Sequence, residues 1–233
     1  LTYDKTFADI HHLNVLGGYS YMDNVAEGFG ATRSGFDTNA FIYNNLGAGT
    51  DYRQGDVYSY KNSCKLISFY GRVNYGLMDK YMITATIRRD GSSRFGADHK
   101  WGTFPSVSVA WRIINEKFME GTHSWLDNLK LRVGYGITGN QNGVDPYKSL
   151  SVLSSAGASY YDAATGTWKN SYVQAQNANP DLKWESTAQF NVGIDFGFLN
   201  RINGSLEFYH KKTSDLLWTY PVPQPPYLVG TML

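Results

Sequence analysis

The sequence is poor in cysteine, in long apolar runs and in net charge, and each shortage excludes a class of protein. Because Cys64 is its one cysteine, the chain cannot build an internal disulfide framework. No segment approaches the roughly 18–20 apolar residues of a membrane-spanning helix, which excludes helical spanning but not spanning by strands. The net charge is +1 and the basic residues are scattered, so the positive stripe that nucleic-acid binding needs is missing. We therefore expect no nucleic-acid partner.

Motifs for catalysis and for cofactor binding are also missing. Residues 134–139 match the pattern G-x-G-x-x-G, but residues 140–146 cannot begin the helix that would face a dinucleotide. The five histidines lack ligand partners at metal-binding spacing. Glu116 and Glu120 lie one helical turn apart without an acid–base partner, and we expect them on a solvated helix face. The sequence thus predicts no catalytic residue, no cofactor and no metal site.

Aromatic residues and runs of alternating polarity are abundant instead. Aromatics make up 15% of the chain, with 18 tyrosines. Between residues 184 and 198, even positions carry apolar side chains such as Phe190 and Ile194, whereas odd positions carry polar or small ones such as Asn191. Successive side chains of a strand point to opposite faces, so this run predicts a strand with one apolar and one polar face. It is more than twice as long as the usual strand of about 5–6 residues.

The same alternation predicts an all-β fold of long antiparallel strands. We expect strands at residues 1–8, 11–22, 67–77, 81–90, 104–112, 128–138, 184–198 and 202–208. Residues 23–62 are predicted to form a long loop, 115–121 a short helix, and 139–182 a polar region with one irregular hairpin. The connections are alternately short and long, as in outer-membrane barrels. An isolated sheet of this kind would have two raw edges, so we expect the missing strands to lie outside this chain.

Two fold classes remain open at this point. In an incomplete antiparallel transmembrane β-barrel, the apolar faces would contact lipid and the aromatics would suit the membrane interface. In a soluble β-sandwich that binds carbohydrate, the same faces would form a core about 10 Å thick. Tyr and Trp are common in both classes, so composition does not choose between them.

One ordered series of motifs is specific. Its members include Ser68-Phe69-Tyr70-Gly71-Arg72, Arg89-Asp90-Gly91-Ser92-Ser93-Arg94-Phe95, Trp101-Gly102-Thr103-Phe104-Pro105, Asn115-Glu116-Lys117-Phe118, Leu129-Lys130-Leu131-Arg132, Thr138-Gly139-Asn140-Gln141 and Asn179-Pro180-Asp181-Leu182-Lys183-Trp184-Glu185. In this order the series resembles the C-terminal barrel half of the SusC/RagA family of TonB-linked outer-membrane transporters. The resemblance is close from residue 63 to 217 and loose elsewhere.

The resemblance implies a place and a function. Family members are 22-stranded barrels that an N-terminal domain plugs, and they pair with a SusD-like surface lipoprotein that delivers glycans or peptides. The TonB energy-transducing complex drives import. Residues 1–233 would then be a partial barrel in outer-membrane lipid of a Gram-negative cell, with the plug and the remaining strands absent. The expected function is nutrient import without enzymatic activity, and the substrate stays open between glycan and peptide.

Strand parity adds candidate site residues. In a barrel, polar positions of the strands would face the lumen or contact the plug, and we predict this for Arg72, Asn74, Arg88, Arg112, Lys130, Arg132, Glu185, Gln189, Asn191 and Asp195. Where a strand leaves the wall, we expect Arg89, Asp90 and Arg94 to pair in a loop network that fixes the extracellular rim. Direct contact of these three with a ligand or with the lid is the alternative.

Overall fold

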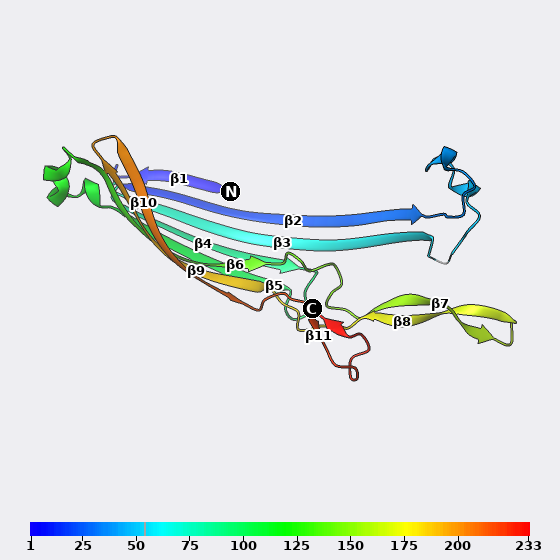
Figure 1. The fold of residues 1–233 in the computed structure, drawn as a ribbon. Coiled ribbons are helices and arrows are strands. Elements are labelled where there is room, and N and C mark those ends of the chain that lie inside the picture. The colour runs from blue at the N-terminus through cyan, green and yellow to red at the C-terminus, as the bar shows by residue number, and fades with distance from the viewer. Residues whose placement is uncertain (54) are drawn as a thin grey trace.

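The computed structural model describes residues 1–53 and 55–233, apart from the side chains of residues 158 and 159. Its main element is one antiparallel eight-stranded sheet in the order β1-β2-β3-β4-β5-β6-β9-β10 (Figure 1). The strands of this sheet are β1 Thr2–Phe7, β2 His11–Ala31, β3 Val57–Leu77, β4 Tyr81–Ser92, β5 Trp101–Arg112, β6 Leu126–Asn140, β9 Glu185–Phe198 and β10 Ile202–Ser214. The all-β prediction is confirmed.

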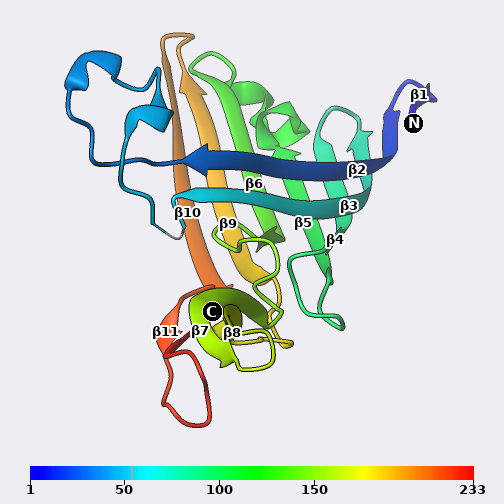
Figure 2. The same cartoon turned by 90° about the vertical axis from the view of Figure 1, so that its right-hand side faces the viewer.

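The sheet is curved and open (Figure 2). Its edges are β1 and β10, and neither pairs with a further strand in the part of the chain that the structure describes. Closing the sheet on itself would require more strands, because a barrel abolishes its edges only by full closure. The architecture is therefore a section of a β-barrel wall, as the sequence pattern predicted.

The two ends of the sheet differ, and we name them by their connections. At the turn end, tight turns join β1 to β2, β3 to β4 and β9 to β10. Two consecutive residues with positive φ close each turn: Ala8 and Asp9, Met78 and Asp79, and Leu199 and Asn200. Asp and Asn tolerate this left-handed conformation better than most residues. At the loop end, the connections are the long segments 32–56, 93–100 and 141–184. The predicted alternation of short and long connections is confirmed except between β5 and β6, where the turn-end segment 113–125 is longer than the loop-end segment 93–100.

The predicted long loop over residues 23–62 is confirmed only for residues 32–56; its two flanks, 23–31 and 57–62, are strand. Strands β2 and β3 have 21 residues each and continue past the rest of the sheet as a two-stranded ribbon, which we name the arm (residues 22–31 and 57–66; Figure 1). Away from its base, where Cys64 is buried, most side chains on both faces of the arm are exposed, so the apolar–polar alternation that marks a strand in the wall fades there. Cross-strand ion pairs support the ladder instead, between Lys65 and Asp23 at 3.6 Å and between Lys61 and Glu27 at 3.0 Å.

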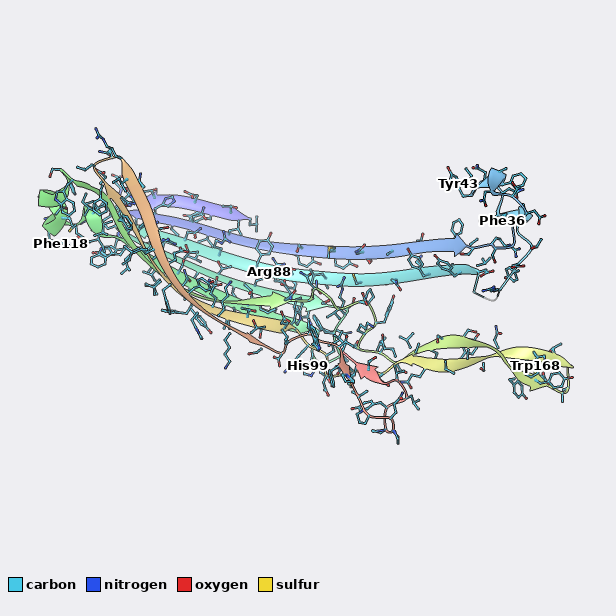
Figure 3. The ribbon with its side chains drawn as sticks, in the orientation of Figure 1. Phe36, Tyr43, Arg88, His99, Phe118 and Trp168 are labelled. Carbon is cyan, nitrogen blue, oxygen red and sulfur yellow. The ribbon has the colours of Figure 1, made fainter. Side chains whose placement is uncertain are left out.

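Smaller elements occupy the ends of the sheet. The predicted short helix is a pair of 3₁₀ turns, η3 Ile113–Asn115 and η4 Lys117–Thr122, at the turn end where Figure 3 labels Phe118. The predicted irregular hairpin is confirmed as β7 Val152–Asp162 and β8 Thr167–Gln176, whose pairing register shifts several times. The 3₁₀ turns η1 Asn39–Phe41 and η2 Leu46–Ala48 and the strands β11 Tyr220–Pro221 and β12 Thr231–Met232 complete the fold. Among the described residues, no helix is long and apolar enough to cross a membrane.

Buried apolar side chains lie at the two ends of the sheet and not on its broad faces. Ile114 and Leu126 lie at the turn end, and the others lie at the loop end. Phe95, Phe104, Val144, Leu182 and Trp184 form one cluster there. By contrast, mid-strand apolar side chains remain exposed in this chain; Ile83, Val109 and Ile194 are between 41% and 45% exposed. No second sheet covers this face within the part of the chain that the structure describes. A sandwich would bury these residues, so the soluble alternative is not supported.

An arginine placed on the apolar face tests whether this face contacts lipid or water. We expect Ile194→Arg to cost about 2–4 kcal/mol at mid-strand and to prevent assembly of the full-length receptor, because lipid cannot solvate the guanidinium. The measurement is the heat-modifiable folded band in the outer-membrane fraction. Ser205→Arg is the matched control, since Ser205 lies on the opposite face, directly across from Asp195, and should tolerate a cation. Equal assembly of both variants would contradict contact with lipid.

Candidate functional site

One face of the sheet is polar across its whole width. Directly opposed residues of neighbouring antiparallel strands point to the same side. The register therefore places side chains of β2 to β10 in one row, and that row reads Asn14, Asn74, Thr84, Ser108, Gly134, Asn191 and Tyr209. We name this side of the sheet the polar face and the other the apolar face. Hollows of about 230 Å³ and 440 Å³ open mainly on the polar face.

The register places all of the predicted lumen-facing residues on the polar face. These are Arg72, Asn74, Arg88, Arg112, Lys130, Arg132, Glu185, Gln189, Asn191 and Asp195. Parity also puts Glu207, Thr86 and Ser68 on this face, although the sequence analysis did not select them. The signal that could have identified Glu207 is its odd position in β10, opposite Gly193.

The middle of the polar face is neutral. Asn74 donates from Nδ2 to Oδ1 of Asn14 at 3.2 Å and accepts from the Thr84 hydroxyl at 2.9 Å. Ser106, Ser108, Gly134 and Gly136 follow on β5 and β6 and line a hollow together with Gln189 and Asn191. Hydroxyls, amides and bare backbone offer hydrogen bonds without charge, so this surface can contact a neutral polar partner closely.

Charges gather on the polar face near the turn end. Arg132 binds Asp195 through two parallel hydrogen bonds, Nε to Oδ2 at 2.9 Å and an Nη to Oδ1 at 2.8 Å, and forms an ion pair with Glu207 at 2.8 Å. Lys130 lies directly across from both Asp195 and Arg112. Bidentate pairs of this kind are among the stronger hydrogen bonds because both partners are ionised and their geometries match. The cluster is therefore a fixed set of charges and not a set of freely moving side chains.

Near the loop end, Arg88 organises a smaller polar group. Its Nε lies 2.9 Å and 2.8 Å from the two carboxylate oxygens of Asp90, and its Nη donates to the hydroxyl of Ser68 at 3.2 Å. Ser68 is fully buried, so this hydrogen bond satisfies a hydroxyl that water cannot reach. Arg88 and Asp90 line the hollow of about 440 Å³ together with Trp184.

The pairing expected among Arg89, Asp90 and Arg94 is replaced by three separate contacts. Arg89 points to the apolar face because it follows Arg88 directly in a strand, and its guanidinium lies 5.3 Å from the ring centre of Trp101. Asp90 pairs on the polar face with Arg88, which lies two residues before it in the same strand. Arg94 donates to the carbonyl of Val144 at 2.7 Å. Sequence proximity suggested one network, but strand alternation separates the first two residues.

Around these residues, the loop-end connections are joined into a rim. Ser92 donates its hydroxyl proton to Gln141 at 2.7 Å, and the amide of Gly96 donates to the carbonyl of Leu182 at 2.9 Å. Trp184 contacts Phe95 and Phe104, with ring centres 4.8 Å and 5.4 Å away. The sequence motifs at residues 90–96 and 179–185 therefore meet in space and pack against each other. Their first role in this structure is to hold the rim together.

Aromatic pairs mark both ends of the apolar face. At the turn end, Tyr81 and Trp111 stack with ring centres 6.3 Å apart, and at the loop end, Phe69 and Trp101 stack at the same spacing. Trp101 is the first residue of β5 and Trp111 is the last but one, so the two lie about 33 Å apart along the strand. With a strand tilt of about 35–45°, that separation corresponds to the apolar band of about 25 Å between the aromatic girdles of outer-membrane barrels.

Glu116 anchors the turn-end girdle, which corrects the prediction that it lies on a solvated helix face. Its carboxylate accepts hydrogen bonds from the Tyr81 hydroxyl at 2.6 Å, from Lys80 at 3.0 Å and from the Trp111 indole at 3.1 Å. These donors, the Tyr81 hydroxyl first, lower the pKa of Glu116 to about 2. The side chain is only 14% exposed, so the carboxylate ties two interfacial rings to the connection between β5 and β6.

The fold and its two faces define the class of protein. Long antiparallel strands with one polar face, one apolar face and an aromatic girdle at each end form the wall of an outer-membrane β-barrel. Residues 2–230 match the family described as "TonB dependent receptor-like, beta-barrel". The chain belongs to the TonB-dependent receptors, as part of a barrel of the SusC/RagA type, and this family consists of outer-membrane proteins.

Individual relatives support the same assignment. The chain is 40% identical to TonB-dependent receptor P3 of Formosa agariphila over 225 residues, which cover 96% of this chain and 22% of that protein. It is 44% identical to TonB-dependent receptor SusC of Bacteroides thetaiotaomicron over 174 residues, or 73% of this chain and 17% of that protein. The solved RagAB peptide transporter aligns with a TM-score of 0.81 and 28% identity over 95% of this chain and 24% of that one. The chain thus spans about a fifth of the length of the curated relatives it matches.

Gly96 tests the packing of the rim. A Cβ atom at this buried position would overlap the carbonyl oxygen of Pro180, so Gly96→Ala must push the two loops apart. We expect a loss of about 1–3 kcal/mol, as for other overpacked sites, and faster protease cleavage of the loop-end connections in the full-length receptor. Gly121→Ala is the control, because a Cβ there meets nothing within 4 Å. Unchanged protease resistance in the Gly96 variant would show that the rim is not packed in this way.

Glu116 gives a pH-dependent prediction. Because the pKa falls from 4.5 in its usual state to about 2, the ionised carboxylate stabilises the folded receptor above about pH 4.5, and this contribution is lost as the pH falls towards 2. Glu116→Gln should therefore lower the melting temperature at pH 7, with a smaller difference from wild type at pH 3. The measurement is thermal unfolding of the purified full-length receptor at both pH values. Glu120→Gln, at an exposed position in η4, should have little effect; an equal loss in both variants would contradict a specific anchor.

Proposed function

We propose that this chain is part of the barrel of a receptor that imports a nutrient across the outer membrane by TonB-dependent transport. The observation that carries the proposal is the continuous polar face across the sheet, which gives a lipid-embedded wall a water-facing inner surface. The names of the relatives agree, since SusC is a TonB-dependent receptor and RagAB is a peptide transporter. Such a receptor moves its ligand without changing a covalent bond, so we propose no enzymatic activity.

Within this proposal, the polar face has two parts. The neutral centre around Asn74, Gln189 and Asn191 lines the route of the ligand. A ligand that moves along uncharged groups can exchange one hydrogen bond for the next without breaking an ion pair. The fixed charges around Arg132 and Asp195 at the turn end contact the plug, because a folded domain can complement a rigid pattern of charge. Arg88 and Glu185 lie outside both parts, nearer the loop end, where Arg88 pairs with Asp90 and Glu185 accepts from Asn140.

The partners follow from the same relatives. We propose a SusD-like surface lipoprotein at the loop end, where the long connections and the rim lie, and the TonB energy-transducing complex acting through segments outside this chain. Asp90 and Arg94 then serve to fix the extracellular rim, and Arg89 with Trp101 lies at the level of the outer lipid headgroups. The transported ligand is a glycan or a peptide.

Uptake by the full-length parent tests the function. Cells that carry the tagged parent should accumulate a radiolabelled mixture of oligosaccharides or of peptides, and accumulation should fall to the level of parent-deleted cells when TonB is deleted. The tagged parent should also copurify from the outer membrane with a surface lipoprotein. Accumulation that is independent of TonB, or a parent confined to the soluble fraction, would contradict the proposal.

A further inference from the structure

Three tyrosine rings of β3, two on the arm and one in the wall, lie across glycines of β2 on the polar side of the sheet. All three tyrosines occupy even positions of β3, as Arg72 does, so they belong to the same side of the sheet as the polar face. The register opposes each ring to a glycine of β2: Tyr58 to Gly30, Tyr60 to Gly28 and Tyr70 to Gly18. Glycine is otherwise unfavourable within strands, and a cross-strand aromatic ring that covers the bare backbone compensates for it.

The rings lie flat because the glycines have no side chain. A Cβ atom at Gly30 would lie 2.6 Å from the Tyr58 ring, and one at Gly28 would lie 2.9 Å from the Tyr60 ring. Each ring therefore covers the backbone of β2 with one face and leaves the other open. In this chain Tyr58 is 56% exposed and Tyr60 is 51% exposed. Two adjacent open aromatic faces form a flat platform for stacking.

Charge is divided between the two sides of the arm. The apolar side carries Asp23, Glu27, Lys61 and Lys65, and these side chains neutralise one another in ion pairs. The side with the tyrosines carries no charged residue along the arm, among residues that the structure describes; its side chains are Met22, Asn24, Ala26, Tyr58, Tyr60, Asn62, Cys64 and Leu66. A ligand that needed ionic contacts, such as the charged ends and side chains of a peptide, would find none on the arm's own residues of this side; the nearest recorded charge is Arg94, which contacts Cys64 at the base of the arm. A neutral ligand with flat apolar faces and many hydroxyls fits better.

The spacing and direction of the platform suit an extended chain of rings. Tyr58 and Tyr60 are two residues apart in one strand, so their centres are about 6.6 Å apart. Asn62 and Asn24 follow on the same side and offer amide hydrogen bonds to hydroxyls. Further along β3, Tyr70 borders a separate hollow of about 260 Å³ on the polar face of the wall, together with Arg72 and Arg88.

We propose that Tyr58 and Tyr60 form a stacking site for pyranose rings of a neutral oligosaccharide, outside the wall on the arm. The C–H-rich face of a pyranose packs against an aromatic face, and its equatorial hydroxyls reach the neighbouring amides. The site takes up the oligosaccharide before it reaches Tyr70 and the lumen. It rests on the import function proposed above and selects a glycan over a peptide as the ligand.

Saturation-transfer NMR on the purified full-length receptor tests the site. The probe is a mixture of neutral oligosaccharides from partial hydrolysis of glucan, xylan, mannan and galactan, with a casein-peptide mixture measured in parallel. We expect saturation of sugar ring protons that Tyr58→Ala with Tyr60→Ala reduces at least tenfold and that the corresponding Phe variants retain. Gly30→Ala should also weaken binding although both tyrosines remain, because it displaces the ring of Tyr58.

Phe29→Ala is the matched control, since Phe29 is an equally aromatic residue of the arm that lies on the opposite side and is 88% exposed. Each variant is first checked for the folded band in the outer membrane; should the double Ala variant fail this check, Gly30→Ala and the Phe variants decide. Binding that is equal in the tyrosine and Phe29 variants, no binding of any neutral oligosaccharide, or tyrosine-dependent binding of peptides alone would overturn the proposal. The proposed import function is tested separately, and it fails if uptake does not depend on TonB.

Discussion

The structure depends on one constraint: each strand of a membrane wall has lipid on one side and water on the other. Inside a bilayer every backbone amide must be paired with a neighbouring strand, and every strand must offer apolar side chains to lipid and polar ones to water. Alternation along β3, β4, β5, β6, β9 and β10 meets this requirement, and the register keeps it in phase from strand to strand, with one shift at the turn end of β6, between Leu126 and Asn128. A slip of one residue in any pair would turn an entire strand inside out, so the register is the feature on which both faces rest.

The ends of the strands are held in different ways because they meet different surroundings. At the turn end, Glu116 ties Tyr81 and Trp111 to a short connection. At the loop end, a small apolar core around Phe95 and Trp184 holds the connections 93–100 and 141–184 together. The loop-end motifs are therefore parts of a packed rim, from which the β7–β8 hairpin extends (Figure 1). Beyond the rim, the arm continues with charges on one side and tyrosines on the other.

Much of this could be predicted from the sequence, and the failures have physical causes. Within the wall, lipid enforces alternation, so Phe190–Ile194 and their neighbours were assigned to the correct faces from parity alone. Outside the wall, water on both sides removes that constraint, and the pattern does not reveal residues 23–31 and 57–62 as strand, although glycine–tyrosine pairs and ion pairs support strands there. Contacts between distant segments, such as that of Glu116 with Tyr81 or of Gly96 with Leu182, are set by tertiary packing and leave no periodic signal. For the same reason the three residues Arg89, Asp90 and Arg94, although close in sequence, have separate partners.

The central claim is that the apolar face meets lipid and the polar face meets water inside a barrel. Single cysteines at Ile194 and Asn191, placed in a full-length receptor without other cysteines and labelled with an environment-sensitive fluorophore, would test it most directly. Both residues lie in β9, on opposite faces and three positions apart. We predict that brominated lipid quenches the label at residue 194 and that aqueous iodide quenches the label at residue 191. The reverse pattern, or equal quenching of both labels by iodide, would contradict the assignment of this sheet to a membrane wall.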